Sequence, residues 1–315
     1  MTLSGCSAEP YNKSFFALDS VVSVTVYPSD EKLGEKVYEC ILSAEECFGK
    51  VCGDDRSAAL TSEDAERINS VLSCAEGLND TLDGRIELYC GGLTSLWGIS
   101  GDDPKIPDES DISDELEKLH SLEPFYVEEG GSGYDMLDLG SAAKGYACDM
   151  AYDMLCDNME KGYSVISAGS SSLLYGEKEG GFSVKVRSPD TEGGILGSFV
   201  CGQGFISTSG GYERFFEADG NVYSHILDPE TGYPVETDLA SVTVYCPIAE
   251  NNGLRSDLLS TMIYIDGTAG LEKYAEYAEK ENIGIIAADN KGNVFSYGID
   301  FHIDKESGYG LWNES

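Results

Sequence analysis

Residues 223–235 read Y-S-H-I-L-D-P-E-T-G-Y-P-V and contain His225, one of only three histidines in the 315-residue chain. Proline fixes φ and restricts the residue before it, so the Asp-Pro pair starts one turn and the Gly-Tyr-Pro triplet reverses the chain again. Read alone, this pattern is typical of a tight surface loop between two strands. A single histidine beside a strand is usually a hydrogen-bonded structural residue, so any chemistry at His225 depends on what other segments bring to it.

The segments around this stretch predict strands that alternate with long helices. Alternating β-branched residues indicate a strand over 15–27, and Ser29 or Asp30 is placed to cap a helix over 31–48. Further helices are expected over 113–120, 142–159, 257–265 and 271–280. The stretch over 164–174 is expected to be a strand that runs into a serine-rich turn, S-A-G-S-S-S. Further strands are expected over 182–187, 197–207, 240–246 and 283–288. Strand pairs that alternate with helices predict an α+β fold of the mixed α/β kind.

The charge of the chain restricts what it can bind. It has 20 basic and 57 acidic residues, which gives a net charge of −37. Such a surface repels nucleic acid and anionic lipid, so binding to a phosphate backbone is disfavoured. A phosphorylated substrate would need local screening by a metal ion or a lysine.

Several common catalytic patterns are missing from the sequence. It contains no G-x-S-x-G and no G-x-x-x-x-G-K-[ST], which disfavours a serine hydrolase and a P-loop nucleotidase. No C-x-x-C occurs among the ten cysteines, which disfavours a zinc or iron–sulfur site. Apart from Cys6, nine cysteines remain without a repeating spacing, and most of them are expected to be buried thiols.

The junction D-L-G-S-A-A-K-G over 138–145 is a candidate phosphate-binding site. Its small residues allow close approach of the backbone to a ligand, and the following helix would offer free N–H groups and the positive end of its dipole. Lys144 would add a point charge to the same phosphate. The alternative is an ordinary small-residue junction between a strand and a helix.

Asp257 and Thr261 are candidate metal ligands. They lie four residues apart, so on a helix their side chains face the same way. A carboxylate, a hydroxyl and a backbone carbonyl are hard oxygen ligands, which suit Mg²⁺ completed by substrate phosphate and water. Taken alone, Asp257 fits the role of a helix N-cap better than that of a metal ligand.

Four blocks of the sequence, in order, resemble the FAD:protein FMN transferase family, often called ApbE. They are L-D-L-G-S-A-A-K-G-Y-A-C-D over 137–149, I-S-T-S-G-G-Y-E-R-F-F over 206–216, the stretch over 223–235, and S-D-L-L-S-T-M-I-Y-I-D-G over 256–267. The resemblance extends over roughly residues 15–270. It implies one domain over 15–315 of mainly antiparallel sheets packed with helices, with Mg²⁺ as cofactor and FAD as substrate.

The resemblance also implies roles for individual residues. The metal ligands would be Asp257, Thr261 and the backbone carbonyl of Ser141, and the catalytic residues would be His225 and Lys144. Contacts to the flavin nucleotide would come from Leu18, Asn69, Glu87, Asp138, Lys144 and Ile226. The chain departs from the family pattern at Leu18 and Asp19, at Glu87 where aspartate is usual, and at Gly92 where proline is usual.

The implied reaction transfers the FMN moiety of FAD to a threonine hydroxyl of an acceptor flavoprotein and releases AMP. Two alternatives stay open. Water could replace the acceptor, which would make the protein a Mg²⁺-dependent FAD pyrophosphatase, or the protein could bind FAD without turnover.

The N-terminus is similar to a bacterial lipobox, with Leu3-Ser4-Gly5 before Cys6. A lipid on Cys6 would anchor the chain to the extracytoplasmic face of the bacterial membrane, with residues 1–14 as lipobox remnant and polar tether. The sequence contains no apolar run of about 18 residues that would predict a transmembrane helix. The acceptor implied by the family is a protein of a membrane-linked or exported redox system.

Overall fold

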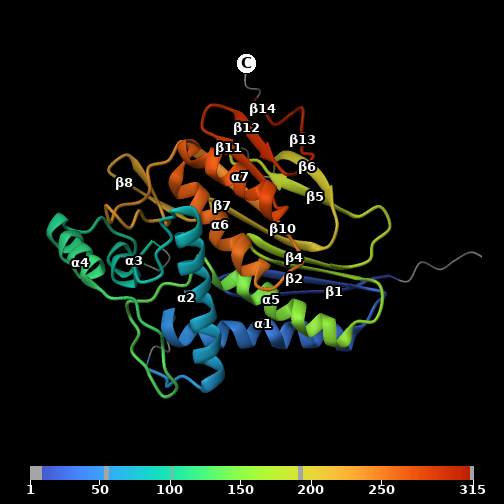
Figure 1. Ribbon diagram of the computed structural model, residues 1–315, viewed down its shortest axis with the longest axis horizontal. Helices are drawn as coiled ribbons and strands as arrows, with labels where there is room; N and C mark the ends of the chain where they lie inside the picture. Colours follow the sequence, from blue (N-terminus) through green and yellow to red (C-terminus); the bar gives the residue numbers. More distant parts are fainter. Residues whose placement is uncertain (1–8, 53–56, 100, 102, 191–193, 313–315) are drawn as a thin grey trace, which may run out of the picture.

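The computed structural model describes residues 9–52, 57–99, 101, 103–190 and 194–312. Within them, a nine-stranded sheet runs through the molecule (Figure 1). Its strands follow the order β1 (Tyr11–Ala17), β2 (Ser20–Tyr27), β3 (Tyr163–Ala168), β4 (Ser171–Gly176), β7 (Gly204–Gly210), β10 (Leu239–Pro247), β11 (Gly284–Asp289), β12 (Asn293–Tyr297) and β14 (Gly310–Leu311). All neighbours are antiparallel except β12 and β14, and the α+β fold with mainly antiparallel sheets is therefore confirmed.

One predicted strand at the N-terminal side is a hairpin instead. The segment expected as one strand over 15–27 turns at Leu18 and Asp19, which both have positive φ, 52° and 53°. Because β1 already begins at Tyr11, residues 11–14 belong to the sheet and not to a tether. The serine-rich turn expected within 164–174 is present at Gly169, and the chain continues after it as a second strand, β4.

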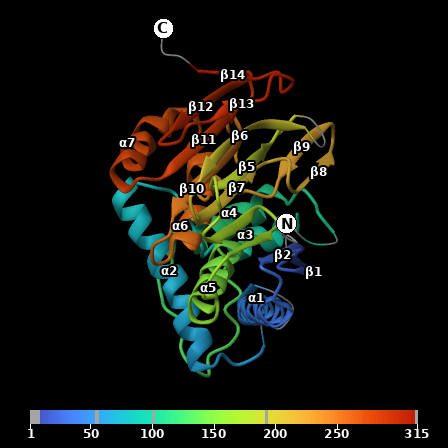
Figure 2. The same cartoon turned by 90° about the vertical axis from the view of Figure 1, so that its right-hand side faces the viewer.

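Three helices cover one face of the sheet and form the main core with it. They are α1 (Glu31–Cys52), α5 (Ala143–Asn158) and α6 (Asn252–Asp266). α2 (Ser62–Leu82), for which no helix was predicted, runs across them, and α7 (Leu271–Glu281) packs beside β11 and β12. Figure 2 shows α1 and α5 towards one end of the molecule and α7 towards the other, with α2 running along the side between them.

The other face of the sheet is covered by a small second sheet of β5 (Phe182–Arg187), β6 (Ile195–Cys201) and β13 (His302–Ile303). Side chains of both sheets form a second core, among them Phe199, Ile206 and Ile286. The predicted strand over 197–207 is wrong as one element, because β6 ends at Cys201 and β7, in the main sheet, begins at Gly204.

A third cluster of apolar side chains lies at the side of the molecule. It joins α3 (Gly91–Trp97) and α4 (Glu109–Ser121) to the ribbon of β8 (Phe215–Ala218) and β9 (Asn221–Ser224) around the buried Trp97. α4 begins four residues before the predicted start at Ser113. Its first turn carries Glu109 and Asp111, and negative charge is favourable at a helix N-terminus.

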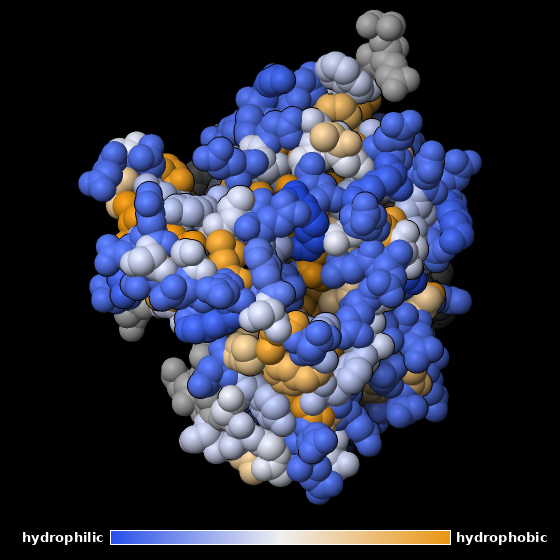
Figure 3. All heavy atoms as spheres, turned by 60° about the vertical axis from the view of Figure 1, so that its left-hand side comes forward, coloured by the Kyte–Doolittle hydropathy of each residue, from blue (hydrophilic) through white to orange (hydrophobic). Residues whose placement is uncertain are grey.

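The surface agrees with the large negative charge. Figure 3 shows hydrophilic residues over most of one face, with hydrophobic residues in a hollow near its centre. Within the described ranges, no helix has the length and apolar character needed to cross a membrane. Of the nine cysteines in these ranges, Cys47, Cys148 and Cys246 are buried, five are half-buried and Cys156 is exposed, so fewer are buried than expected.

Candidate functional site

The N-terminus of α5 lies directly against α6. The backbone N–H of Gly145 donates to Oδ2 of Asp257 at 2.8 Å. A Cβ at position 145 would come within 2.4 Å of the carbonyl oxygen of Gly253 and 2.7 Å of Cβ of Asp257, so only glycine permits this approach. The junction over 138–145 therefore contacts the helix that carries Asp257 and Thr261. In the sequence, only the family resemblance connected these two segments.

This contact leaves the carbonyl of Ser141 without its ordinary helical partner. In a regular helix the N–H of Gly145 would donate to the carbonyl four residues earlier, which is Ser141. The N–H of Tyr146 donates to Ala142, and those of Ala142 and Ala143 donate to Leu139. Over the described residues, no hydrogen bond ends on the Ser141 carbonyl, so its oxygen remains able to bind a ligand.

Asp257 is a buried carboxylate, and it is not a helix N-cap. It is 3% exposed and lies in the second turn of α6, whose N-cap is Asn251. Burial raises the pKa of Asp257, while the charge of Lys144 and the hydrogen bond from Gly145 oppose that rise. Within the described ranges, Asp257 has no ion-pair partner within 4.0 Å, so its charged form lacks a neighbouring cation to offset the cost of its burial, and a bound cation would stabilise that form.

Hydroxyl groups between β7 and α6 hold Thr261 next to this carboxylate. Oγ1 of Thr261 lies 3.0 Å from Oγ of Ser209 and 3.4 Å from the carbonyl oxygen of Asp257. Ser209 also lies 2.8 Å from Ser260, and Ser207 bonds to Ser171 and Ser256. A packed row of hydroxyls therefore fixes the face of α6 that carries both candidate ligands.

His225 is held in one tautomer. Its Nδ1 lies 3.1 Å from the carbonyl oxygen of Arg214, which can only accept, so the neutral ring carries its proton on Nδ1 and leaves the lone pair on Nε2. Burial lowers the pKa of His225 to about 4, assisted by the charges of Lys144 and Arg214 and opposed by that of Asp138. The ring is therefore neutral at pH 7 and can accept a proton.

The charge of Lys144 acts on several groups of the site. Lys144 lowers the pKa of both His225 and Asp257, and it also acts on Glu213. No carboxylate within the described ranges lies in ion-pair distance of its ammonium group. The methylene chain of Lys144 passes Gly169, where an added Cβ would lie 3.7 Å from Cδ. Its charge is thus available to a substrate.

Glu213 also interacts with these charges, although no role was predicted for it. Burial raises the pKa of Glu213, Lys144 and Arg187 lower it, and Asp257 raises it further. Its side chain accepts a hydrogen bond from Ser170 in the turn between β3 and β4. The sequence contained its signal, because Glu213 lies within the block over 206–216 that carries the family resemblance.

Three of the residues that were predicted to contact the flavin nucleotide lie around His225 and Lys144. Asp138 accepts from the N–H of Gly140 at 2.8 Å and from the hydroxyl of Thr94 at 2.7 Å, so its carboxylate is fixed. Ile226 is buried beside His225. Leu18 lies at the tip of the β1–β2 turn, where the carbonyl of Asp19 accepts from Arg214 at 2.9 Å.

Two other residues that were predicted to contact the nucleotide, Asn69 and Glu87, have different surroundings. The amide of Asn69 is bonded in both directions to the backbone of Val127, at 2.8 and 2.9 Å, and so anchors that segment. Glu87 accepts from the N–H of Tyr89, and burial raises its pKa. Glu87 lines a hollow of about 340 Å³ together with Arg85, His120 and Glu230.

A larger hollow of about 420 Å³ lies beside α3 and α4. Its lining includes Tyr89, Leu93 and Lys105, and none of His225, Lys144 and Asp257 is part of either lining. The site around Asp257 is therefore defined by its polar contacts rather than by either of these hollows. Over the described residues, no group of three or more His, Cys, Asp or Glu side chains could hold a metal ion, and a site at Asp257 would rely on a single carboxylate.

Comparisons with known proteins agree on one family. Residues 54–287 match the model of the ApbE family. A relative named FAD:protein FMN transferase, from Klebsiella pneumoniae, is 29% identical over 302 residues, covering 91% of this chain and 92% of the relative. The crystal structure of the ApbE protein from Thermotoga maritima has a TM-score of 0.72 at 22% identity, covering 94% and 97% of the two chains. The flavin transferase ApbE from Vibrio cholerae has a TM-score of 0.70 at 20% identity, covering 95% and 98%.

Proposed function

Because the chain belongs to the ApbE family, we propose that it transfers the FMN moiety of FAD to a hydroxyl group of an acceptor protein and releases AMP. The observation that carries this proposal is the buried carboxylate of Asp257, which lies against the N-terminus of α5. A helix N-terminus and a lysine attract a phosphate group, and a buried carboxylate without a cationic partner attracts a cation. The two together fit a metal-bound diphosphate.

The donor atoms support Mg²⁺ as the cofactor. Asp257, the hydroxyl of Thr261 and the unused carbonyl of Ser141 are all hard oxygen donors, and Mg²⁺ prefers few protein ligands completed by water and substrate phosphate. When bound, the ion would neutralise charge on the diphosphate in a protein whose net charge is −37.

The residues of this chain then have distinct tasks. The acceptor hydroxyl attacks the phosphorus on the FMN side of FAD, a new P–O bond forms, and the bond to the bridging oxygen breaks. The bonding electron pair leaves with AMP. Nε2 of His225 is unprotonated and accepts the proton of the hydroxyl. Lys144 stabilises negative charge on the transferring and leaving phosphates.

The acceptor group is proposed to be a threonine. A mass-spectrometric assay with FAD, Mg²⁺ and a threonine-bearing acceptor domain tests this and separates the alternatives. A flavin adduct on the acceptor supports transfer. Free FMN with AMP would instead mean hydrolysis, and unchanged FAD would mean binding alone.

Asp257→Asn tests the metal assignment at the same site. The amide keeps the size of the side chain and an acceptor for the N–H of Gly145, but it removes the charge. We expect flavin transfer to fall by at least about 100-fold, because one preorganised charge contributes on that order to catalysis. Asp157→Asn, which removes an exposed carboxylate from α5, is the matched control and should keep full activity. Full activity of Asp257→Asn would remove Asp257 from the site.

The cellular setting is proposed from the sequence. Cys6 and residues 1–8 lie outside the described part of the chain, so the lipid anchor and the extracytoplasmic position stay predictions. The acceptor is proposed to be an exported or membrane-linked redox protein. Mass spectrometry of the mature N-terminal peptide from bacterial membranes tests the anchor, and an unmodified Cys6 would contradict it.

A further inference from the structure

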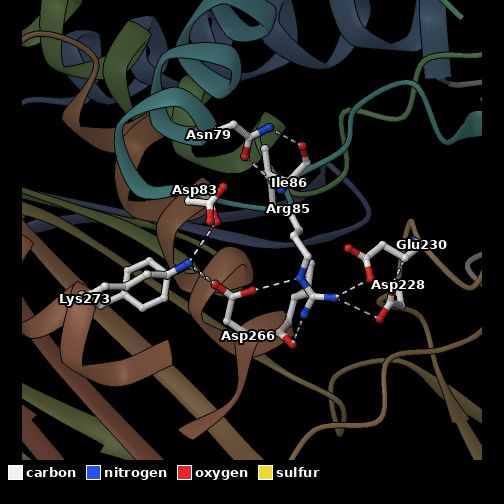
Figure 4. A network of polar contacts seen from close by, with 10 residues as sticks. Asn79, Asp83, Arg85, Ile86, Asp228, Glu230, Asp266 and Lys273 are labelled. Carbon is white, nitrogen blue, oxygen red and sulfur yellow. Dashed lines mark hydrogen bonds and ion pairs between the residues drawn. The ribbon is translucent and has the colours of Figure 1, made fainter. Parts of the chain in front are cut away.

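The guanidinium group of Arg85 connects three segments that are far apart in the sequence. Its Nε donates to Oδ1 of Asp266 at 3.1 Å, and its Nη2 donates to the carbonyl oxygen of Ile265 at 3.0 Å. Nη1 lies 3.3 Å from Oδ2 of Asp228 and 3.7 Å from Oε2 of Glu230. Figure 4 shows the group between Asp266 on one side and Asp228 with Glu230 on the other.

The Asp266 side of this contact is a fixed anchor at the end of α6. Its side chain is 9% exposed and also binds Lys273 at 2.7 Å and the hydroxyl of Tyr274 at 2.6 Å. Burial alone would raise the pKa of Asp266, but hydrogen bonds from Lys273, Tyr274 and Arg85 lower it, so the group is ionised. Arg85 also lies at the C-terminal end of α6, where a positive charge is favourable.

The Asp228 side belongs to the turn that follows His225. Oδ1 of Asp228 accepts from the N–H of Glu230 at 2.8 Å, and its backbone bonds to Gly232 and Tyr233. The opposite side of the same turn is held by Trp97, whose Nε1 donates to the carbonyl of Gly232 at 2.8 Å. The turn over 226–235 is therefore held by Arg85 at Asp228, by Trp97 at Gly232 and by His120, whose Nε2 lies 3.1 Å from the carbonyl oxygen of Pro229.

We propose that Arg85 is a positioning residue that fixes His225 relative to Asp257 and Thr261. α6 carries Asp257 and Thr261 and ends at Asp266, and His225 lies three residues before Asp228. Arg85 links these two ends, and its planar guanidinium group holds its donors in a rigid fork, whereas the ammonium group of a lysine is a compact point charge. The catalytic consequence rests on the proposed flavin transfer, whereas the structural coupling does not.

Hydrogen exchange of the folded, full-length protein tests the coupling without any activity. Arg85→Met should raise the exchange rate of amides over 226–235 about tenfold, because their turn loses one of the side-chain contacts that hold it from other segments. Asp228→Asn keeps an acceptor for the N–H of Glu230 but removes the charge that faces Arg85. It should raise exchange over 226–235 in the same way, and it replaces Arg85→Met as the test if that variant folds poorly. Lys273→Met is the matched control: it removes another ion pair of Asp266 without a contact to the turn, and it should leave exchange over 226–235 unchanged.

Steady-state kinetics test the catalytic consequence. For Arg85→Met we expect kcat to fall about 10- to 100-fold with the KM for FAD changed less than about threefold, because a misplaced catalytic group slows the reaction more than it weakens binding. Arg85→Lys should recover only part of this loss. Unchanged exchange over 226–235 in both Arg85→Met and Asp228→Asn would overturn the proposal, as would an equal effect of Lys273→Met. A wild-type protein without transferase activity would contradict the proposed function alone, and exchange would still decide the coupling.

Discussion

At the scale of single residues, His225 has an environment that couples its protonation to folding. Its pKa is about 4 in the folded protein against 6.5 for an unperturbed histidine, mainly because burial disfavours the charged ring. Between pH 6.5 and 4 the unfolded chain therefore binds more protons than the folded one. Linkage then requires that the stability contributed by His225 is lost as the pH falls through this window.

His225→Gln tests this relation. We expect the free energy of unfolding of the wild type to fall more steeply between pH 6.5 and 4 than that of the variant, with a difference of up to about 3 kcal/mol. Urea denaturation at several pH values measures it, with His302→Gln at an exposed position as the control for histidine removal. Parallel curves for wild type and His225→Gln would show that the ring is not shielded from solvent.

The residue scale also separates what the sequence could reveal from what it could not. The spacing of Asp257 and Thr261 correctly suggested one helical face, but the N-cap alternative for Asp257 was wrong because α6 begins earlier, at Asn252. Nothing in local sequence indicates that Gly145 donates to Asp257 from 112 residues away. The roles of Ser141, Lys144 and His225 came from the family resemblance, and they stay predictions.

At the scale of secondary-structure elements, the contact between α5 and α6 determines the site. Gly145 allows it, and Asp149 on α5 strengthens it by accepting the N–H groups of Gly253 and Leu254 at 2.8 and 2.7 Å, at the start of α6. A single residue of α5 thus satisfies two of the donors that every helix N-terminus leaves unpaired. The distance of Ser141, which precedes α5, from Asp257 and Thr261 on α6 therefore depends on this packing.

Gly145→Ala should force the two helices apart. The new Cβ would meet backbone atoms of Gly253, which cannot rotate away, and we expect a loss of roughly 2–4 kcal/mol in the free energy of unfolding. Gly77→Ala in α2 is the matched control, since a Cβ there meets no atom within 4 Å and should stabilise the helix by up to about 1 kcal/mol. Equal stability of Gly145→Ala and wild type in urea denaturation would show that α5 and α6 tolerate a wider separation.

Elements were predicted well where one pattern ran without interruption and poorly where a turn lacked its usual residues. The start of α1 followed from Asp30, whose Oδ1 accepts from the N–H of Leu33 at 3.0 Å. The β1–β2 turn was missed because Leu18 and Asp19 adopt positive φ, which glycine or asparagine usually signals. Tertiary contacts hold it instead, since the N–H of Leu18 donates to Glu45 at 2.8 Å.

At the scale of the whole molecule, the net charge of −37 opposes the approach of FAD, which is itself an anion. Salt screens such long-range repulsion, because the Debye length falls to about 10 Å near 0.1 M. Raising KCl from about 20 to about 200 mM at constant free Mg²⁺ should therefore speed the association of FAD several-fold, measured by stopped-flow flavin fluorescence. A slower association at higher salt would mean that local positive charge, from Lys144 and Arg214, controls the encounter.

The most direct test of the whole account is the location of a divalent cation. We expect crystals grown with Mn²⁺ and FAD to give an anomalous difference peak within about 2.5 Å of Asp257, Thr261 and the Ser141 carbonyl, in contact with the diphosphate. Lys144 and Nε2 of His225 should face the same phosphates. A peak elsewhere, or FAD bound with Asp257 contacting only Gly145, would contradict the assignment of this site.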